Sequence, residues 1–216
     1  MDKFLIDHDI NSDSGIVETN YFDLNNSIDK RLFLVDNFYS DPYAVREFAL
    51  SQQFYDDDGY QGMRTRKQFF FHGVKERFES IVGLKITDWE SQTMNGRFQT
   101  CVAGTPLVYH CDSQKWAGIV FLSPDAPPSC GTSFFRSKIN KKHHNSQIDW
   151  NTSEGIETFN QKTFMDRSPY ELVDSVGNIF NRLVIFDGGL IHAASDYFGW
   201  DIASSRLFHM FFFNAE

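Results

Sequence analysis

The sequence has few cysteines and no long apolar run. Three of its 216 residues are cysteine, an odd and small set that does not suggest a disulfide framework and favours a reducing compartment. No stretch approaches the ~20 apolar residues that cross a bilayer. The apolar run from Phe4 to Ile6 is too short, and its flanks too acidic, for a signal peptide. We therefore expect a cytoplasmic protein with no membrane partner.

An excess of basic residues is also absent. The chain has 29 acidic and 20 basic residues, a formal net charge of −9. Because phosphate groups are bound mainly by Lys and Arg, this balance argues against nucleic acid as a partner. Arg64, Arg66 and Lys67 form one local basic cluster, which we interpret as a solvated face. A contact between Arg64 and an acidic substrate is the alternative.

Aromatic residues, in contrast, are abundant. They make up 16% of the chain, and Phe alone occurs 23 times, much of it in short runs. Phe is a good strand residue, so this usage favours a β-rich core. The length fits a single domain covering residues 1–216.

The first 94 residues read as a helical and irregular support for that core. Residues 1–30 are polar and look weakly structured or like a short edge element, and residues 31–35 read as a strand. A turn leads into a helix that Ser40 or Asp41 can cap and that Pro42 can begin. A loop is expected at 55–67 and a short helix at 78–84.

From residue 97 onward the pattern changes to short β-favouring runs separated by turn signals. The expected strands are 97–103, 107–112, 117–122, 132–136, 182–186, 191–194 and 206–213. Residues 137–178 are polar and irregular, with a helix expected around 154–164. The predicted fold class is mainly β with supporting helices, an antiparallel sandwich or barrel formed by residues 95–213.

The segment Tyr109-His110-Cys111-Asp112 is the most informative for function. In a strand, residues i and i+2 point to the same face, so His110 and Asp112 would present an imidazole and a carboxylate side by side. A His-x-Asp triplet alone is weak evidence, because it occurs often by chance. His192, which follows an apolar strand and a Gly-Gly turn, can supply a third ligand. Two His and one carboxylate on one face of an iron ion leave three positions open, as in non-haem Fe(II) oxygenases.

Arg206 adds specificity to this set. It lies 14 residues past His192 and begins the apolar strand that ends at Phe213. A buried Arg at such a position needs an anionic partner, and its planar guanidinium matches a carboxylate in a two-point hydrogen bond. The far carboxylate of 2-oxoglutarate would be a suitable partner. A surface Arg at a strand start is the alternative.

The ordered set His-x-Asp, His, Arg resembles that of the 2-oxoglutarate/Fe(II)-dependent dioxygenases, particularly their prolyl-hydroxylase-like branch. The resemblance covers roughly residues 95–213, and residues 34–64 resemble the amino-terminal part of a little-characterised bacterial and phage branch. It implies a double-stranded β-helix (jelly roll) fold. It also implies that His110, Asp112 and His192 bind Fe(II) and that Arg206 binds the co-substrate 2-oxoglutarate.

The activity implied by this resemblance is an oxidation with O₂. One atom of O₂ would hydroxylate a C–H bond of a protein side chain or a small molecule, and 2-oxoglutarate would leave as succinate and CO₂. Asp112 argues against halogenation, because iron halogenases in this family lack the carboxylate. Phe208 and Phe121 stand where many members place a Ser or Thr and a Tyr that also contact 2-oxoglutarate. Thr132 would compensate if it faces inward.

Two other functions stay open. The first is a non-catalytic, cupin-like module that binds a metal or a small ligand. The second is a structural jelly roll that binds no metal. The substrate and the oligomeric state are not specified by the sequence. The remaining polar and sulfur-containing residues have ordinary interpretations: a solvated loop for His143 and His144, a core or surface position for His209, and packed thiols for Cys111 and Cys130.

Overall fold

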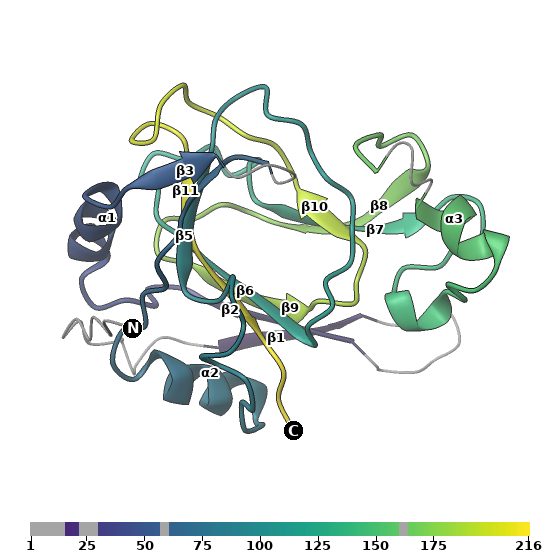
Figure 1. Cartoon of the computed structure of the whole chain (residues 1–216), viewed down its shortest axis with the longest axis horizontal. Coiled ribbons are helices and arrows are strands. Elements are labelled where there is room, and N and C mark those ends of the chain that lie inside the picture. Colours follow the sequence, from purple (N-terminus) through teal and green to yellow (C-terminus); the bar gives the residue numbers. More distant parts are fainter. Residues whose placement is uncertain (1–15, 22–29, 57–60, 160–163) are drawn as a thin grey trace.

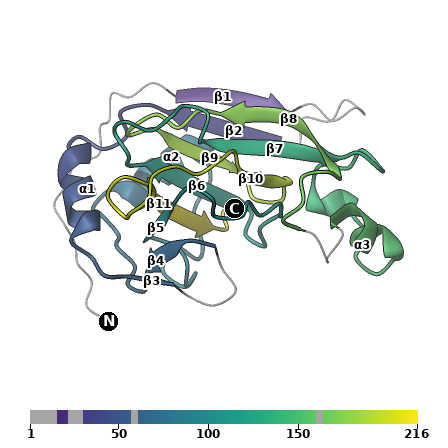
Figure 2. The ribbon, with the colours of Figure 1, turned by 90° about the horizontal axis from the view of Figure 1, so that it is seen from above.

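The chain folds into two antiparallel β-sheets that face each other, with helices packed at the outside (Figures 1 and 2). A computed structural model describes residues 16–21, 30–56, 61–159 and 164–216. In this part of the chain the large sheet has the strand order β1-β2-β9-β6-β11-β5-β4-β3, and the small sheet has the order β10-β7-β8. This arrangement is jelly-roll-like and confirms the predicted fold class.

The strands of the large sheet are β1 (Ile16–Tyr21), β2 (Lys30–Val35), β3 (Phe54–Asp56), β4 (Met63–Thr65), β5 (Arg97–Cys101), β6 (Trp116–Phe121), β9 (Leu183–Asp187) and β11 (Arg206–Phe213). Those of the small sheet are β7 (Thr132–Ser137), β8 (Tyr170–Val176) and β10 (His192–Ala194). The helices are α1 (Pro42–Leu50), α2 (Val74–Val82) and α3 (Ser153–Phe159), with a 3-10 turn at Asn145–Gln147. No helix in the described ranges is long and apolar enough to cross a membrane.

Strand β11 shows how the sequence separates two cores. Its residues alternate, so that Leu207, Phe211 and Phe213 pack into an outer core. Phe208 and Met210 pack into the inner core between the two sheets. Arg206 lies two residues before Phe208 and therefore shares the inner face. The inner face of the large sheet thus carries the residues that can surround a ligand.

The amino-terminal helices cover the outer core. Asp41 caps α1 by accepting a hydrogen bond of 2.9 Å from the backbone N–H of Ala44. Val45 and Ala49 of α1, with Val74 and Phe78 of α2, pack against the outer face of the large sheet. Helix α3 lies at the opposite end of the molecule from α1, beyond the small sheet (Figure 1).

Several expected elements differ in the structure. The first 94 residues are more than a helical and irregular support, because they add four strands to the large sheet. Two of these strands, β3 and β4, lie where we expected the loop 55–67. Strand β8 lies in the segment expected to be irregular, and its central residues, 172–175, are exposed. The edge element expected within residues 1–30 is β1, Lys30 begins β2, and residues 1–15 and 22–29 lie outside the described residues.

Candidate metal centre

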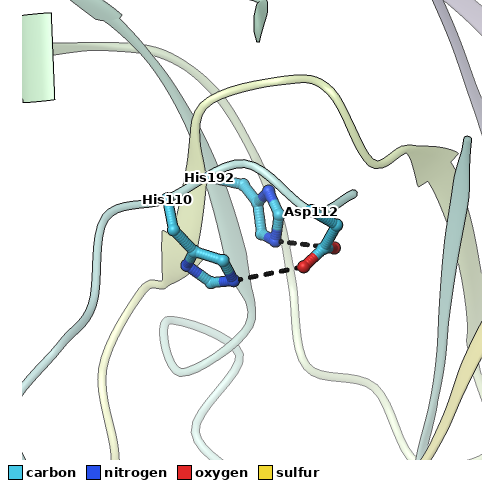
Figure 3. A group of neighbouring side chains, drawn as sticks. All are labelled: His110, Asp112 and His192. Carbon is cyan, nitrogen blue, oxygen red and sulfur yellow. Dashed lines mark ion pairs between the residues drawn. The ribbon is translucent and has the colours of Figure 1, made fainter. Parts of the chain in front are cut away.

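The structure brings His110, Asp112 and His192 together (Figure 3). One ligand atom from each of the three lies within 4.8 Å of the others. The Nε2 atom of His110 is 3.5 Å from Asp112 Oδ1, and the Nε2 atom of His192 is 3.5 Å from Asp112 Oδ2. The two nitrogens therefore face one carboxylate from two sides.

The other ring nitrogen of each histidine is held by the backbone. His110 Nδ1 lies 3.0 Å from the carbonyl oxygen of Val108, and His192 Nδ1 lies 2.9 Å from that of Leu190. Since a carbonyl only accepts, the proton of each neutral ring resides on Nδ1. This leaves the lone pairs of both Nε2 atoms directed at the shared point, as in metal-ligating histidines.

The electrostatics keep His192 neutral and Asp112 ionised. Burial, together with the nearby charge of His110, lowers the pKa of His192 to about 4. Burial alone would raise the pKa of Asp112, but the two histidines outweigh it and lower that pKa. Burial acts to lower the pKa of His110, but the hydrogen bond and the charge of Asp112 outweigh burial and raise that pKa. A neutral imidazole and a carboxylate are the forms that bind a cation.

The donor set fits a divalent metal ion. Asp112 Oδ2 is buried and makes no hydrogen bond within the described part of the chain, and a buried carboxylate oxygen without a partner is costly. Two imidazole nitrogens and one carboxylate on one side of a site, with open positions opposite, are characteristic of non-haem Fe(II) centres. The residues present therefore suit Fe(II).

The ligand segment is positioned by its backbone, although it is not a regular strand. We expected a strand over residues 107–112, and this was wrong: His110 forms an isolated antiparallel bridge with His192. His110 N–H donates to His192 O at 3.0 Å, and His192 N–H donates back at 2.9 Å. Asp112 N–H donates to Gly188 O at 2.7 Å. Three backbone hydrogen bonds thus fix the three side chains without a full ladder.

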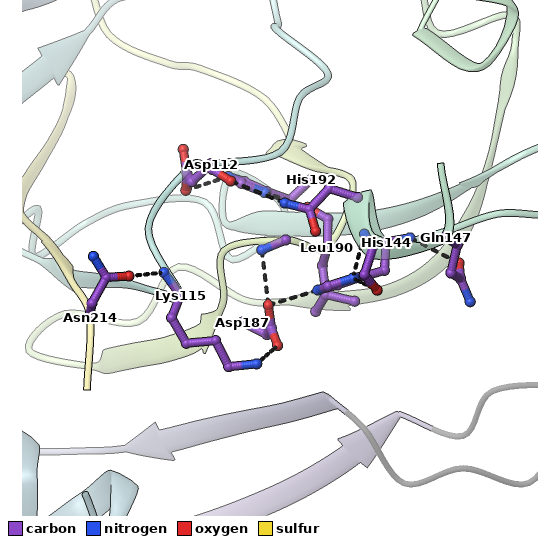
Figure 4. A network of polar contacts seen from close by, with 11 residues as sticks. Asp112, Lys115, His144, Gln147, Asp187, Leu190, His192 and Asn214 are labelled. Carbon is purple, nitrogen blue, oxygen red and sulfur yellow. Dashed lines mark hydrogen bonds and ion pairs between the residues drawn. The ribbon is translucent and has the colours of Figure 1, made fainter. Parts of the chain in front are cut away.

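A buried polar cluster lies behind the ligands, around Asp187 at the end of β9 (Figure 4). Asp187 Oδ1 is 2.9 Å from His144 Nε2 and accepts from Gly189 N–H at 2.9 Å, and Oδ2 is 2.7 Å from Lys115 Nζ. These contacts tie together the turn before His192, the segment after Asp112 and the loop at His144. The predicted solvated position of His144 was wrong, because its side chain is buried against Asp187.

Arg206 is buried on the inner face of β11. Its Nε donates to Cys130 O at 2.9 Å and its Nη2 to Gly131 O at 3.1 Å, and Thr132 Oγ1 lies 3.5 Å from Nη2. No carboxylate of the described residues pairs with it. Thr132 is opposite Ala194, two residues along β10 from His192. Two residues of a strand span roughly 7 Å, so Arg206 reaches the small sheet close to the candidate metal ligand His192.

The aromatic rings of Phe121 and Phe208 cover the guanidinium of Arg206. The Arg206 Cζ atom lies 5.2 Å from the Phe121 ring centroid and 4.6 Å from that of Phe208. Tyr197, at 5.9 Å on the loop before β11, brings a hydroxyl-bearing ring to the same guanidinium. The sequence pattern did not identify Tyr197, since it lies in a loop without a motif.

A cavity of about 960 Å³ opens beside the candidate metal ligands. His110 and Asp112 line it, together with Met210 and Phe212 of β11 and with Tyr197. A smaller cavity of about 380 Å³ contacts His110 and Asp112 as well. The volume of the large cavity falls within the range of known small-molecule sites.

Solved structures with a similar fold bind a metal and 2-oxoglutarate. HygX from Streptomyces hygroscopicus, with nickel and 2-oxoglutarate bound, matches with a TM-score of 0.50 and 11% identity, over 83% of this chain and 80% of that chain. The HygX structure that also holds hygromycin B matches equally, with a TM-score of 0.50, 10% identity and the same coverage. At this identity the similarity establishes the fold.

Sequence comparison gives a family without an assigned activity. No curated protein matches the chain. The model of a family of unknown function, DUF6445, matches residues 24–196, which include both histidines and the aspartate of the candidate metal centre but not Arg206. The chain therefore belongs to the DUF6445 family.

Proposed function

We propose that this protein is an Fe(II)- and 2-oxoglutarate-dependent oxygenase that hydroxylates a C–H bond. The observation that carries the proposal is the convergence of His110 Nε2, His192 Nε2 and the Asp112 carboxylate at one point beside a large cavity. The jelly-roll-like fold, similar to HygX, supports it. The prolyl-hydroxylase-like branch is proposed only on the order of the motifs.

Each residue of the candidate site would have a distinct role in this reaction. His110, Asp112 and His192 would hold Fe(II), which, when bound with 2-oxoglutarate, supplies the activation of O₂. Arg206 would bind the distal carboxylate of 2-oxoglutarate, since its guanidinium is buried without a carboxylate partner among the described residues. Phe121 and Phe208 would exclude water around that pair, which strengthens it. The balance is one O₂ and one 2-oxoglutarate consumed for one hydroxylated product, succinate and CO₂.

A non-catalytic, cupin-like metal-binding module is the second candidate. It is favoured by the way Arg206 already donates to two backbone carbonyls, under two Phe rings. In such a module the metal would bind, but 2-oxoglutarate would gain no affinity from the metal.

The two functions differ in measurable behaviour. We expect calorimetry without O₂ to show that 2-oxoglutarate binds in the presence of Fe(II) and not in its absence. Admission of O₂ should then release succinate slowly even without a primary substrate. His110→Ala should abolish both effects, whereas His72→Ala, at an exposed histidine, should change neither. Metal binding without any effect on 2-oxoglutarate would establish the non-catalytic module instead.

A further inference from the structure

The small cavity of about 380 Å³ beside the candidate metal ligands has aromatic walls. His110 and Asp112 line it, as they also line the large cavity. The rings that line it belong to Tyr109, Trp150, Phe159 and Phe164. The small cavity therefore joins the candidate metal centre to a group of aromatic side chains.

The indole of Trp150 is packed against α3. It stacks on the ring of Phe159, with 5.4 Å between the ring centroids and 19° between the planes. Phe159 ends α3 and is 7% exposed, so the stack rests on a core residue. Gly155 of α3 allows the close packing, because a Cβ there would lie 3.2 Å from Trp150 Cα and 3.4 Å from its Cε3. Trp150 is nevertheless 53% exposed, so much of a positioned indole stays open to a ligand.

Tyr109 and Phe164 form another part of the aromatic wall. The buried ring of Tyr109 stacks on Tyr170 at 5.2 Å and meets Phe135 edge-on at 5.1 Å. The backbone N–H of Tyr109 donates to Phe164 O at 2.8 Å, which places Phe164 beside the segment of the candidate ligands. Phe164 is 44% exposed and lines both cavities. A second large apolar side chain is thus open to a ligand close to the candidate metal centre.

Charged groups are few in the small cavity. Among the described residues that line it, Asp112 is the only acidic one and none is Lys or Arg. The Asp112 carboxylate lies 3.5 Å from both His110 Nε2 and His192 Nε2, so it belongs to the candidate metal centre. The amide of Asn145 donates to Asp112 O at 3.4 Å. An uncharged apolar group therefore matches this lining, because an ion would lose its hydration there without gaining a partner.

The lining favours an aromatic group over an aliphatic one. Aromatic rings attract one another in stacked and edge-to-face arrangements, beyond the effect of buried area alone. Large exposed apolar side chains that gather at one cavity commonly mark a ligand site. Trp150 and Phe164 do so beside the candidate metal ligands, and a ring inserted between them would cover both.

We propose that the small cavity binds an aromatic ring of the primary substrate, stacked against Trp150. The substrate class is then a compound with a neutral phenyl or indole group, and the C–H bond to be hydroxylated lies on or next to that ring. This inference rests on the proposed function, since it assumes that the metal and 2-oxoglutarate bind at His110, Asp112 and His192.

The test uses the full chain loaded with Ni(II) and 2-oxoglutarate, which allows binding without turnover. The probes are the N-acetyl amides of phenylalanine, tryptophan, leucine and glutamine, titrated by calorimetry. We expect the better of the two aromatic probes to bind at least about tenfold more tightly than the glutamine probe, a difference of ~1.4 kcal/mol. The leucine probe should bind more weakly than that aromatic probe, since it lacks a ring.

Two variants at Trp150 and one control assign the preference to this cavity. Trp150→Ala should remove most of the aromatic preference, whereas Trp150→Phe should restore part of it. Trp200→Ala changes a tryptophan that is 84% exposed on the loop before β11 and should leave the preference unchanged. Thermal unfolding of each variant checks that the chain is folded.

Proton NMR locates the bound ring relative to the metal. With Mn(II) in place of Ni(II), the ring protons of the aromatic probe should broaden, and with diamagnetic Zn(II) they should not. Equal affinities for the aromatic, leucine and glutamine probes would overturn this inference alone, as would an aromatic preference that persists in Trp150→Ala or ring protons that Mn(II) does not broaden. Failure of Ni(II) and 2-oxoglutarate to bind together would overturn the proposed function and this inference with it.

Discussion

Asp187 should stabilise the fold behind the candidate metal centre through its charge. Burial acts to raise its pKa, but hydrogen bonds from His144 and Lys115 lower it from 3.8 to about 2. At ~1.36 kcal/mol per pKa unit, this difference corresponds to about 2 kcal/mol of stability. Asp187 is 1% exposed, so solvent screens this contribution little. Asp187→Asn keeps the shape and removes the charge, and should lower the free energy of unfolding at pH 7 by about 2 kcal/mol.

The stabilisation by Asp187 should decrease as the pH falls. Because the folded pKa is depressed, the stabilisation is fully present above pH ~4 and is lost as the pH falls towards 2. Urea unfolding of the metal-free protein at pH 7 and at pH 3 measures the effect. A loss of about 2 kcal/mol should also lower the melting temperature by about 4–8 °C for a chain of this size.

The control is Asp174→Asn, at an exposed carboxylate on β8. Its free energy of unfolding should match that of the wild-type protein at both pH values. If Asp187→Asn has wild-type stability at pH 7, or loses the same stability at pH 3 as at pH 7, the charge of Asp187 does not support this region and the reasoning is refuted.

Three further variants test other parts of the structure. Gly189→Ala would place a Cβ 2.1 Å from His144 Nε2 and should lower the free energy of unfolding by ~1–3 kcal/mol, as measured by urea unfolding. In the double variant with Asp187→Asn, the total loss should be smaller than the sum of the two single losses. Arg206→Gln should weaken 2-oxoglutarate binding at least about tenfold by calorimetry and leave Ni(II) affinity unchanged; unchanged 2-oxoglutarate affinity would exclude Arg206 as its anchor. Burial lowers the pKa of His209 to about 3, so the folded state disfavours its protonation and stability should fall below pH ~6.5. His209→Gln should reduce the loss of stability below pH ~6.5 when the free energy of unfolding is measured as a function of pH. An unchanged pH dependence would show that His209 is not its cause.

The sequence predicted the central strands well because their patterns are local. Residues 206–213 were expected as a strand and are one, and their alternation between the two cores follows from the chain itself. Helix α1 was expected from Pro42 and its cap, and Asp41 provides the cap. Strands β3, β4 and β8 were missed, because strands at or next to the edge of a sheet depend on a neighbour for their hydrogen bonds more than on their own pattern.

The sequence predicted which residues form the candidate metal site, but it did not predict the polar contacts that hold them in place. His110, Asp112 and His192 carry a spacing and an order that resemble a known family. The contacts of Asp187 join β9 to a segment 72 residues earlier, at Lys115, and to one 43 residues earlier, at His144. Partners so distant in sequence leave no local pattern. For the same reason the prediction that Arg64 lies on a solvated face was wrong: Arg64 is buried, and it is opposite Gln99 in the register of β4 and β5.

The most direct test of the central claim is a crystal structure of the protein with Ni(II) and 2-oxoglutarate. The account predicts one metal ion bound by His110 Nε2, His192 Nε2 and an Asp112 oxygen, at distances of about 2.0–2.2 Å. The 2-oxoglutarate should chelate the same ion and extend its distal carboxylate to Arg206. A metal bound elsewhere, or 2-oxoglutarate that contacts neither the ion nor Arg206, would contradict the account.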